Sequence, residues 1–364
     1  MVMVLGGGEI GITIMRCFGE RLRTHIPNLG RNSVMEMGTA IPARALGSIT
    51  VPALLTGMWQ VAGGHGKIDI KKAVDEMKVY TEAGFGTFDL ADIYGPAEVI
   101  FGMFLKEYPG NKRVQGLTKF VPRPGPMTRA IVEASIDRSR KNMGVQTLDL
   151  VQFHWWDYED ERYLDAAKYL IELQQEGKIL ELALTNFDTH HMKRIADSSC
   201  RLVSNQVAYS IIDRRPEKKM VYWCLENNVK ILAYGSLLGG FLSDKYFGKP
   251  EPTRRELTTS SLVKYKYTID QWGDWNLFQE LLLVLKRIAE KYAVSISNIA
   301  VRYIADKPTV AAVIIGARLS IAEHIAENLR TFSFPGIDDE DKSLIHHIVR
   351  RGRELPGDCG DEYR

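Results

Sequence analysis

Residues 148–187 read LDLVQFHWWDYEDERYLDAAKYLIELQQEGKILELALTNF and decide the fold. Apolar runs of strand length stand at both ends of this stretch. Between them, residues 163–177 space their apolar side chains as a helix does and end on Gly177, a residue typical of the position after a helix. A strand, a helix and a second strand in this order predict two parallel strands joined by a crossover helix.

The same unit recurs along the chain from residue 51 onward. We expect strands at 51–59, 86–90, 114–120, 148–154, 179–187, 202–209, 230–236 and 310–317. We expect helices at 68–84, 97–108, 128–142, 163–177, 189–197, 216–228, 276–292, 297–306 and 321–331. This alternation predicts an α/β protein built as a (β/α)8 TIM barrel, whose chemistry belongs at the carboxyl ends of the strands. A doubly wound parallel sheet is the alternative fold.

The composition is that of an ordinary globular protein, with 45% hydrophobic residues, 25% charged residues and a net charge of +2 over 364 residues. This balance gives no reason to expect nucleic acid or a membrane surface as a partner. The four cysteines form no C-x-x-C pair, which suits a reducing compartment, and the cytoplasm is the expected location. We expect no metal site, and a monomer or weak oligomer.

The N-terminal stretch VMVLGGGEIG (2–11) has the G-x-G-x-x-G spacing of a dinucleotide-binding turn. That turn needs a second strand with an acid about 20 residues further on, and the only acid in range, Glu36, stands in a poor strand. We therefore expect residues 1–41 to be an extension, either flexible or organelle-targeting. A Rossmann domain is the alternative.

The rest of the chain divides into a barrel over 42–335 and a C-terminal helix and tail over 336–364. Within the barrel, residues 243–275 are expected to form a lid or a crossover above a cofactor. The tail sequence DCGDEYR (358–364) has no assigned role, and disorder is its simplest interpretation.

Polar side chains follow three consecutive expected strands: Asp89 and Tyr94, then Lys119, then His154. Singly, each has a structural explanation, as a cap, a packed ring, a solvated charge or a core histidine. Together they form a chemical set. A nearby ammonium lowers the pKa of a tyrosine hydroxyl, a carboxylate holds that lysine in place, and a histidine donates a hydrogen bond to a substrate oxygen.

The segments FDLADIYGPAEVIFG (88–102), LTKF (117–120) and LDLVQFH (148–154) resemble the aldo-keto reductase family, over roughly residues 42–335. The resemblance implies reduction of an aldehyde or ketone to an alcohol, with hydride from a nicotinamide cofactor. It makes Tyr94 the proton donor, with Lys119 tuning it, Asp89 pairing with the lysine and His154 positioning the carbonyl. Leu90 departs from the family's usual Thr or Ser, and Asp92 is a competing carboxylate.

The resemblance also implies a cofactor lying across the barrel mouth. It assigns the nicotinamide carboxamide to Asn186 and Gln206, ring stacking to Tyr234, and the 2′-phosphate to Arg318, which favours NADPH over NADH. NADH is the second candidate because Leu319 and His324 replace residues that usually contact the phosphate. The full set of cofactor residues is Thr185, Asn186, Gln206, Tyr234, Gly235, Ser236, Leu237, Gly316, Arg318, His324, Glu327 and Asn328.

Three tryptophans are candidates for the substrate pocket: Trp59, Trp155 and Trp156. We expect one of the two adjacent tryptophans to face the pocket and the other to pack. Such walls suit apolar or aromatic carbonyl compounds as the small-molecule substrate. The alternative function is an NADPH-binding, redox-sensing or regulatory subunit with little turnover.

Overall fold

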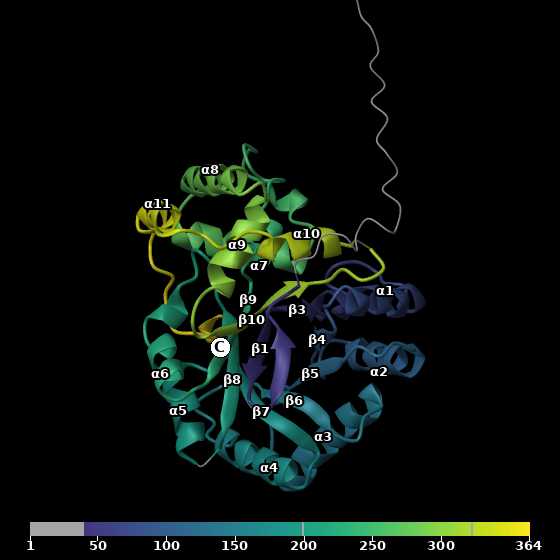
Figure 1. Ribbon diagram of the computed structural model, residues 1–364. Coiled ribbons are helices and arrows are strands. Elements are labelled where there is room, and N and C mark those ends of the chain that lie inside the picture. Colours follow the sequence, from purple (N-terminus) through teal and green to yellow (C-terminus); the bar gives the residue numbers. More distant parts are fainter. Residues whose placement is uncertain (1–39, 199, 322) are drawn as a thin grey trace, which may run out of the picture. The chain divides into compact units, whose positions relative to one another are not determined.

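The computed structural model describes residues 40–198, 200–321 and 323–364. The glycine-rich stretch at 2–11 lies outside the described residues. Parallel strands close into a barrel in the order β10-β3-β4-β5-β6-β7-β8-β9 (Figure 1). The barrel strands are β3 (Leu54–Gly57), β4 (Thr87–Asp89), β5 (Gln115–Phe120), β6 (Leu148–Phe153), β7 (Ile179–Thr185), β8 (Leu202–Ala208), β9 (Lys230–Tyr234) and β10 (Val310–Gly316). The predicted TIM barrel is confirmed, and the doubly wound alternative is wrong.

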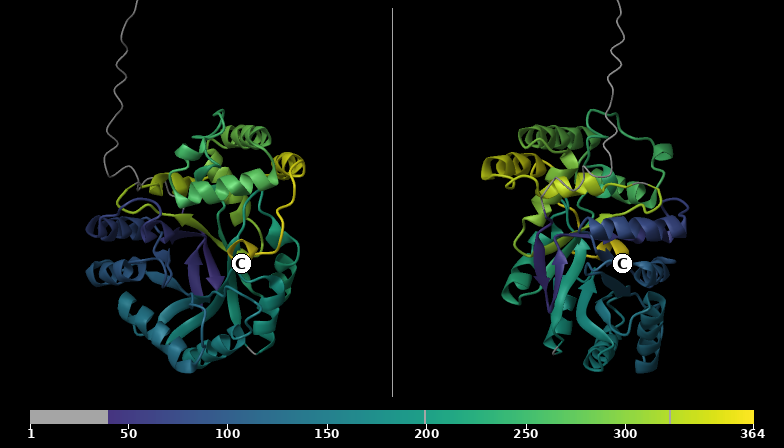
Figure 2. Two further views of the ribbon diagram at one scale, coloured as in Figure 1. Left: turned by 180° about the vertical axis from the view of Figure 1, so that it is seen from behind. Right: turned by 45° about the vertical axis from the view of Figure 1, so that its right-hand side comes forward.

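Helices surround these strands, as Figure 2 shows from two further directions. Local chemistry sets their ends: the Asp69 side chain accepts the Lys72 backbone N–H at the start of the first helix, and Gly144 ends the third in a left-handed conformation. The helices are α1 (Ile70–Glu82), α2 (Ala97–Glu107), α3 (Arg129–Met143), α4 (Tyr163–Gln175), α5 (Thr189–Asp197), α6 (Met220–Glu226), α7 (Ser260–Trp272), α8 (Trp275–Lys291), α9 (Ile296–Ala305), α10 (Ile325–Leu329) and α11 (Asp339–Val349).

The first expected strand, 51–59, is not one strand. Its beginning belongs to β2 (Ile49–Pro52), which pairs antiparallel with β1 (Ala43–Leu46) in a hairpin, and only β3 joins the barrel. The chain changes partner after Pro52, where the next backbone N–H bonds to Pro42 instead of a barrel strand. Apolar character alone does not distinguish the two strands.

Three other segments differ from the sequence expectation, the last of them the tail 358–364, for which disorder was the simplest interpretation. Residues 243–275 contain the full helix α7, which the sequence pattern did not predict. The helix expected over 321–331 is only the short α10. The tail 358–364 has a described path to the C-terminal mark in Figure 1, and it lies against the ends of several barrel strands.

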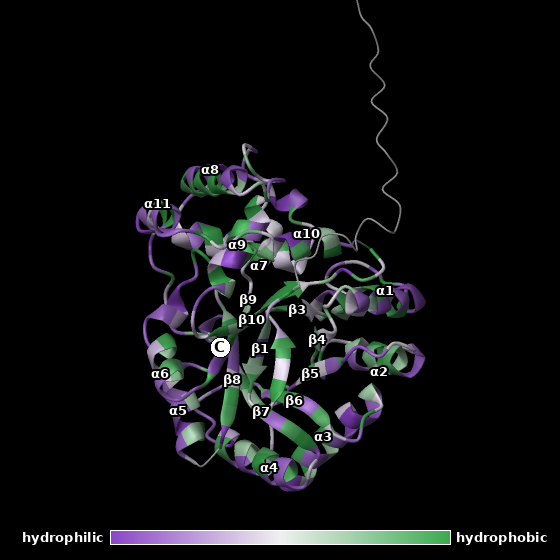
Figure 3. Cartoon of the chain, in the orientation of Figure 1, coloured by the Kyte–Doolittle hydropathy of each residue, from purple (hydrophilic) through white to green (hydrophobic). Residues whose placement is uncertain are grey.

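The inside of the barrel has an apolar and a polar level. Leu117 of β5 and Leu150 of β6 belong to an apolar cluster inside the barrel, and the hairpin residue Leu46 joins it. Two residues further along the same strands, Lys119 and Gln152 are also buried. Because residues two apart share a face of a strand, the inward face turns polar near the carboxyl ends. Figure 3 shows the hydrophobic strands and the hydrophilic outer faces of the helices.

Candidate active site

A buried ion pair lies at the centre of the barrel mouth. The Nζ of Lys119 on β5 is 2.7 Å from a carboxylate oxygen of Asp89, the last residue of β4, and 2.8 Å from the Leu90 carbonyl. The Lys119 side chain is 5% exposed and the Asp89 side chain is 4% exposed. The parallel pairing of β4 with β5 places these two side chains close together. Asp89 pairs with Leu117, and Lys119 lies two residues further along β5 on the same inward face. The competing carboxylate, Asp92, does not take this place: its carboxylate instead accepts the Val121 backbone N–H.

Two glutamines complete the surroundings of the Asp89 carboxylate. The Gln152 amide donates to Asp89 at 2.9 Å, and the Gln206 amide donates to Asp89 and to the Gln152 oxygen, both at 2.6 Å. Sequence reasoning missed Gln152, although a polar residue inside the apolar strand LDLVQF was a signal. Gln206 therefore has both of its amide hydrogens engaged with the ion-pair layer, so only its carbonyl oxygen is left for a carboxamide.

Tyr94 lies beside the ion pair, in the loop between β4 and α2. The Lys119 ammonium is 4.8 Å from the centre of its ring. Burial raises the pKa of Tyr94 well above 10, and the nearby Asp89 carboxylate raises it further. Burial also lowers the pKa of Lys119, against the opposing effect of Asp89. This direction is opposite to the expected lowering of the tyrosine pKa, because burial is the largest cause of the shift.

His154 directly follows β6, and its Nδ1 is 3.2 Å from the Thr185 carbonyl oxygen. A carbonyl only accepts, so this hydrogen bond requires the proton on Nδ1. Burial lowers the pKa of His154 to about 4, so the ring is neutral at pH 7. In that form Nε2 carries a lone pair and accepts a hydrogen bond. The expected donation from this histidine to a substrate oxygen needs either the other tautomer or the doubly protonated ring.

The adjacent tryptophans take different positions. Trp155 is 3% exposed and packs in the core near Phe153 and Tyr163, with its indole N–H bonded to the Asp157 and Asp160 carbonyls. It therefore does not line a pocket at the mouth. Trp156 instead meets the His154 ring edge-on, 4.5 Å between ring centres.

Trp59 stands in a short 3-10 helix directly after β3. Its ring packs edge-on against His65, with 4.9 Å between ring centres. Trp59 and Trp156 thus remain the two pocket candidates.

The residues expected at the nicotinamide lie at the ends of β7, β8 and β9. The Thr185 hydroxyl donates to the Gln206 carbonyl at 3.2 Å. Asn186 has a left-handed backbone, and its side-chain oxygen accepts the Tyr234 hydroxyl at 2.8 Å. These strand ends are neighbours in the barrel. The structure therefore brings Thr185, Asn186 and Tyr234 close to Gln206, which hydrogen-bonds to Asp89.

The loop after β9 offers a place for phosphates. Gly235, Ser236 and Leu237 follow Tyr234 there, and Ser236 is 1% exposed. The Ser236 hydroxyl is buried with no hydrogen-bond partner among the described residues. A buried hydroxyl without a partner is costly, and a phosphate oxygen would satisfy it. The loop therefore fits the pyrophosphate of a dinucleotide.

The residues expected at the adenosine end are more exposed. Arg318 follows Gly316, the last residue of β10, and its guanidinium donates to the His65 carbonyl at 3.3 Å. Leu319, which replaces a hydroxyl residue, is fully buried in the core. Three further residues belong to or flank α10: His324 at its N-terminal boundary, Glu327, whose carboxylate accepts the Ser295 hydroxyl, and Asn328.

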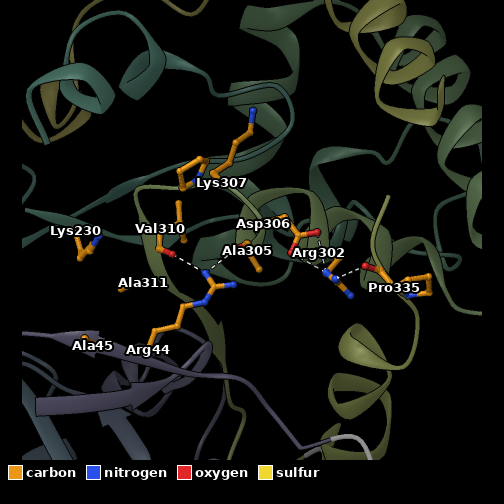
Figure 4. A pocket seen from close by; sticks show the side chains of 11 residues that line it. Arg44, Ala45, Lys230, Arg302, Ala305, Asp306, Lys307, Val310, Ala311 and Pro335 are labelled. Carbon is orange, nitrogen blue, oxygen red and sulfur yellow. Dashed lines mark hydrogen bonds and ion pairs between the residues drawn. The ribbon is translucent and has the colours of Figure 1, made fainter. Parts of the chain in front are cut away.

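The described cavity of about 560 Å³ is not at this site. It is lined by Arg44 of β1, by Lys230 and Val310 at the beginnings of β9 and β10, and by residues at the end of α9 (Figure 4). That is the opposite end of the barrel strands from Asp89 and Lys119. We assign the chemistry to the mouth because the buried ion pair, Tyr94 and His154 meet there.

Within the described residues, no helix is both long and apolar enough to cross a membrane. Those residues also hold no cluster of three or more His, Cys, Asp or Glu side chains arranged to bind a metal ion.

Comparison with known proteins supports the fold and the family. The chain is 26% identical to L-glyceraldehyde 3-phosphate reductase of Escherichia coli O157:H7 over 322 residues, covering 84% of this chain and 90% of that protein. It is 27% identical to flagellar radial spoke protein 5 of Chlamydomonas reinhardtii over 257 residues, which is 59% of this chain; the match spans about half of that relative (49%). A solved glycerol dehydrogenase from Gluconobacter oxydans shares the fold, with a TM-score of 0.71, 23% identity, and coverage of 87% of this chain and 97% of that one.

The family model described as "Aldo/keto reductase family" matches residues 53–350. This match covers every barrel strand and ends before the tail 358–364. The chain therefore belongs to the aldo/keto reductase family of oxidoreductase enzymes.

Proposed function

We propose that the protein reduces an aldehyde or ketone to an alcohol with NADPH. The observation that carries this proposal is the buried Asp89–Lys119 ion pair beside Tyr94 and near the neutral His154. A structural salt bridge needs no tyrosine and histidine around it. Buried ion pairs contribute little net stability, so a functional reason for this one is favoured.

The reaction adds a hydride to the carbonyl carbon and a proton to the carbonyl oxygen. The nicotinamide supplies the hydride when the cofactor is bound. Tyr94 gives the proton from its hydroxyl, and the raised pKa keeps that proton in place at neutral pH until the oxygen becomes basic. The Lys119 ammonium then stabilises the phenolate, while Asp89 holds the lysine. His154 would orient the substrate oxygen by donating from Nε2 in the other neutral tautomer, and Trp156 beside it provides an apolar wall.

The cofactor is assigned to the residues between the ends of β7 and α10. Asn186 and Gln206 would hold the carboxamide, Tyr234 the nicotinamide ring, and Gly235, Ser236 and Leu237 the pyrophosphate. At the other end, Gly316, Arg318, His324, Glu327 and Asn328 would hold the adenosine part. A guanidinium suits the 2′-phosphate, which favours NADPH, with NADH as the second candidate.

The test is oxidation of NADPH followed by absorbance with a panel of aromatic and aliphatic aldehydes. We expect Tyr94→Phe to lower turnover by about 10²–10⁴-fold, because the general acid is removed while the ring is kept. Tyr222→Phe is the matched control, since Tyr222 is exposed on α6. Full activity in Tyr94→Phe would show that the proton comes from elsewhere.

A second candidate function is favoured by the contacts of the tail with Tyr234 and Asn186 at the mouth. The alternative is an NADPH-binding regulatory protein that turns over slowly and signals its bound state to another protein. In such a protein, a segment at the mouth could respond to cofactor binding. Negligible turnover with every aldehyde, together with tight NADPH binding and a stable protein partner, would favour this regulatory function. We place the protein in the cytoplasm, as a monomer or weak oligomer, on the cysteine pattern and composition alone.

A further inference from the structure

The segment formed by residues 358–364, here called the tail, contacts the candidate nicotinamide site. After α11 the chain runs along α7, where the Arg353 backbone N–H bonds to the Trp272 carbonyl at 2.6 Å and the Arg353 side chain to the Gln271 carbonyl at 3.0 Å. Leu355 and Cys359 are buried. The path leading into the tail is therefore fixed by specific contacts.

Three consecutive residues hold the tail in the mouth. Glu362 accepts a hydrogen bond from the Arg215 guanidinium at 2.8 Å, and its other carboxylate oxygen is 2.9 Å from the Tyr234 hydroxyl oxygen. The Tyr363 hydroxyl accepts the Lys264 ammonium at 2.6 Å, and its ring centre is 6.1 Å from that of His154. The Arg364 guanidinium donates to the backbone carbonyls of Asn186 (2.7 Å) and Trp155 (3.2 Å), and lies over the Tyr158 ring at 3.9 Å.

The backbone of the tail also lies very close to Asn186. Gly360 has a φ of +88°, and a Cβ built there would overlap the carbonyl oxygen of Asn186. Only glycine fits both the conformation and the space. This close approach makes Gly360 a position at which one methyl group would displace the tail.

The tail contacts two of the residues assigned above to the cofactor, through the backbone carbonyl of Asn186 and the hydroxyl of Tyr234. Asn186 and Tyr234 would hold the nicotinamide half. The Glu362 carboxylate also lies between two cations, Arg215 and Lys264. Burial opposes its ionisation, but Arg215 and then Lys264 lower the pKa of Glu362, so it is an anion in the mouth. A carboxylate at that position would repel the phosphates of a dinucleotide.

We propose that the tail is a built-in plug that competes with the nicotinamide half of the dinucleotide and must leave the mouth before that half binds. This inference rests on the proposed cofactor site. The hydrogen bonds described above for the tail go to Arg215, Tyr234, Lys264, Asn186 and Trp155 and do not include Arg318, which is assigned to the adenosine end. When a binding-competent state is only partly populated, the apparent affinity falls by that fraction.

Calorimetric titration with NADPH tests the plug in four proteins: the wild type, Gly360→Ala, a chain with residues 358–364 replaced by a glycine–serine stretch of equal length, and Gly144→Ala. Gly144 is the matched control, since it also has a positive φ (+68°) but nothing near its Cβ. If the tail leaves the site open for about a tenth of the time in the wild type, the two tail variants should bind NADPH about tenfold more tightly. Gly144→Ala should bind it as the wild type does. Adenosine 2′,5′-bisphosphate, which lacks the nicotinamide half, should bind all four proteins equally.

The outcomes separate this inference from the proposed function. Equal NADPH affinity in all four proteins overturns the plug and leaves the reductase proposal standing. If neither NADPH nor adenosine 2′,5′-bisphosphate binds any of them, the cofactor assignment fails and the plug fails with it. In the wild type, saturating NADPH should also speed hydrogen exchange of the tail amides. Slower exchange would show that the tail closes over bound cofactor, which contradicts competition.

Discussion

The two ends of the barrel both carry arginine and lysine side chains, but these side chains have different kinds of partner. At the N-terminal end of the strands, the Arg44 guanidinium donates to the carbonyls of Ala305 and Val310, both at 2.6 Å. At the carboxyl end, Lys119 meets the carboxylate of Asp89, which is held by two glutamines from other strands. At the N-terminal end, a cation satisfies backbone carbonyls at the end of a helix and the start of a strand. At the carboxyl end, side chains from several strands hydrogen-bond to one another.

The difference shows why an open volume is a poor guide to function here. The described cavity lies at the Arg44 end, beneath the hairpin side of the barrel (Figure 4). At the carboxyl end of the strands, the tail hydrogen-bonds to Arg215 and to the Asn186 carbonyl. We therefore assign the chemistry from the perturbed ionisable groups and their convergence, and not from empty space. Three substitutions sharpen this comparison, beginning with the largest expected effect on stability.

Lys119→Met should cost about 3–5 kcal/mol in the free energy of unfolding, because it leaves the Asp89 carboxylate buried without its counter-charge. Chemical denaturation measures this. The double variant Lys119→Met with Asp89→Asn should recover most of the loss, since no charge is then buried alone. If the single variant costs less than about 1 kcal/mol, as exposed pairs do, the ion pair is not desolvated as described.

The stability of the protein should fall on acidification through His154. The pKa of this histidine is lowered by burial from 6.5 to about 4, so the unfolded chain binds more protons between those values. The contribution of His154 to the free energy of unfolding is fully present above pH 6.5. It is lost as the pH falls toward 4, to a total of about 3 kcal/mol. Urea denaturation across this range should show a smaller fall for His154→Asn. Identical pH profiles for both proteins would contradict a neutral, buried His154.

Arg44→Met should lower the free energy of unfolding by about 1–3 kcal/mol, because two backbone carbonyls lose a charged donor. Turnover with an aldehyde should not change, since Arg44 lies at the other end of the strands from Tyr94. A loss of turnover without a loss of stability would give the N-terminal end a catalytic role and break the comparison.

Much of the active end was predictable from local sequence. Strand–helix alternation predicted the barrel, and Asp89, Tyr94, Lys119 and His154 were expected together because they follow neighbouring strands. The split of 51–59 was not predictable, because a hairpin strand and a barrel strand are equally apolar. Helix α7 was missed in a segment rich in tyrosine and lysine, whose buried face depends on what packs against it.

The tail shows the limit of local reasoning most clearly. DCGDEYR has no periodicity and no apolar run, and the sequence alone suggested disorder. Its order depends on Arg215, Lys264 and Asn186, which come from other parts of the chain. The sign of the Tyr94 pKa shift was likewise decided by burial, which no nearby residue reveals.

Periodicity and spacing thus determined the fold class and predicted which polar residues converge at the carboxyl ends of the strands, to which we assign the chemistry. These properties depend on contacts within a strand–helix unit or between adjacent units. The folded chain alone decided the hydration of those groups, the tautomer of His154 and the position of the tail. These properties depend on contacts between residues far apart in sequence, and on the water that such contacts exclude.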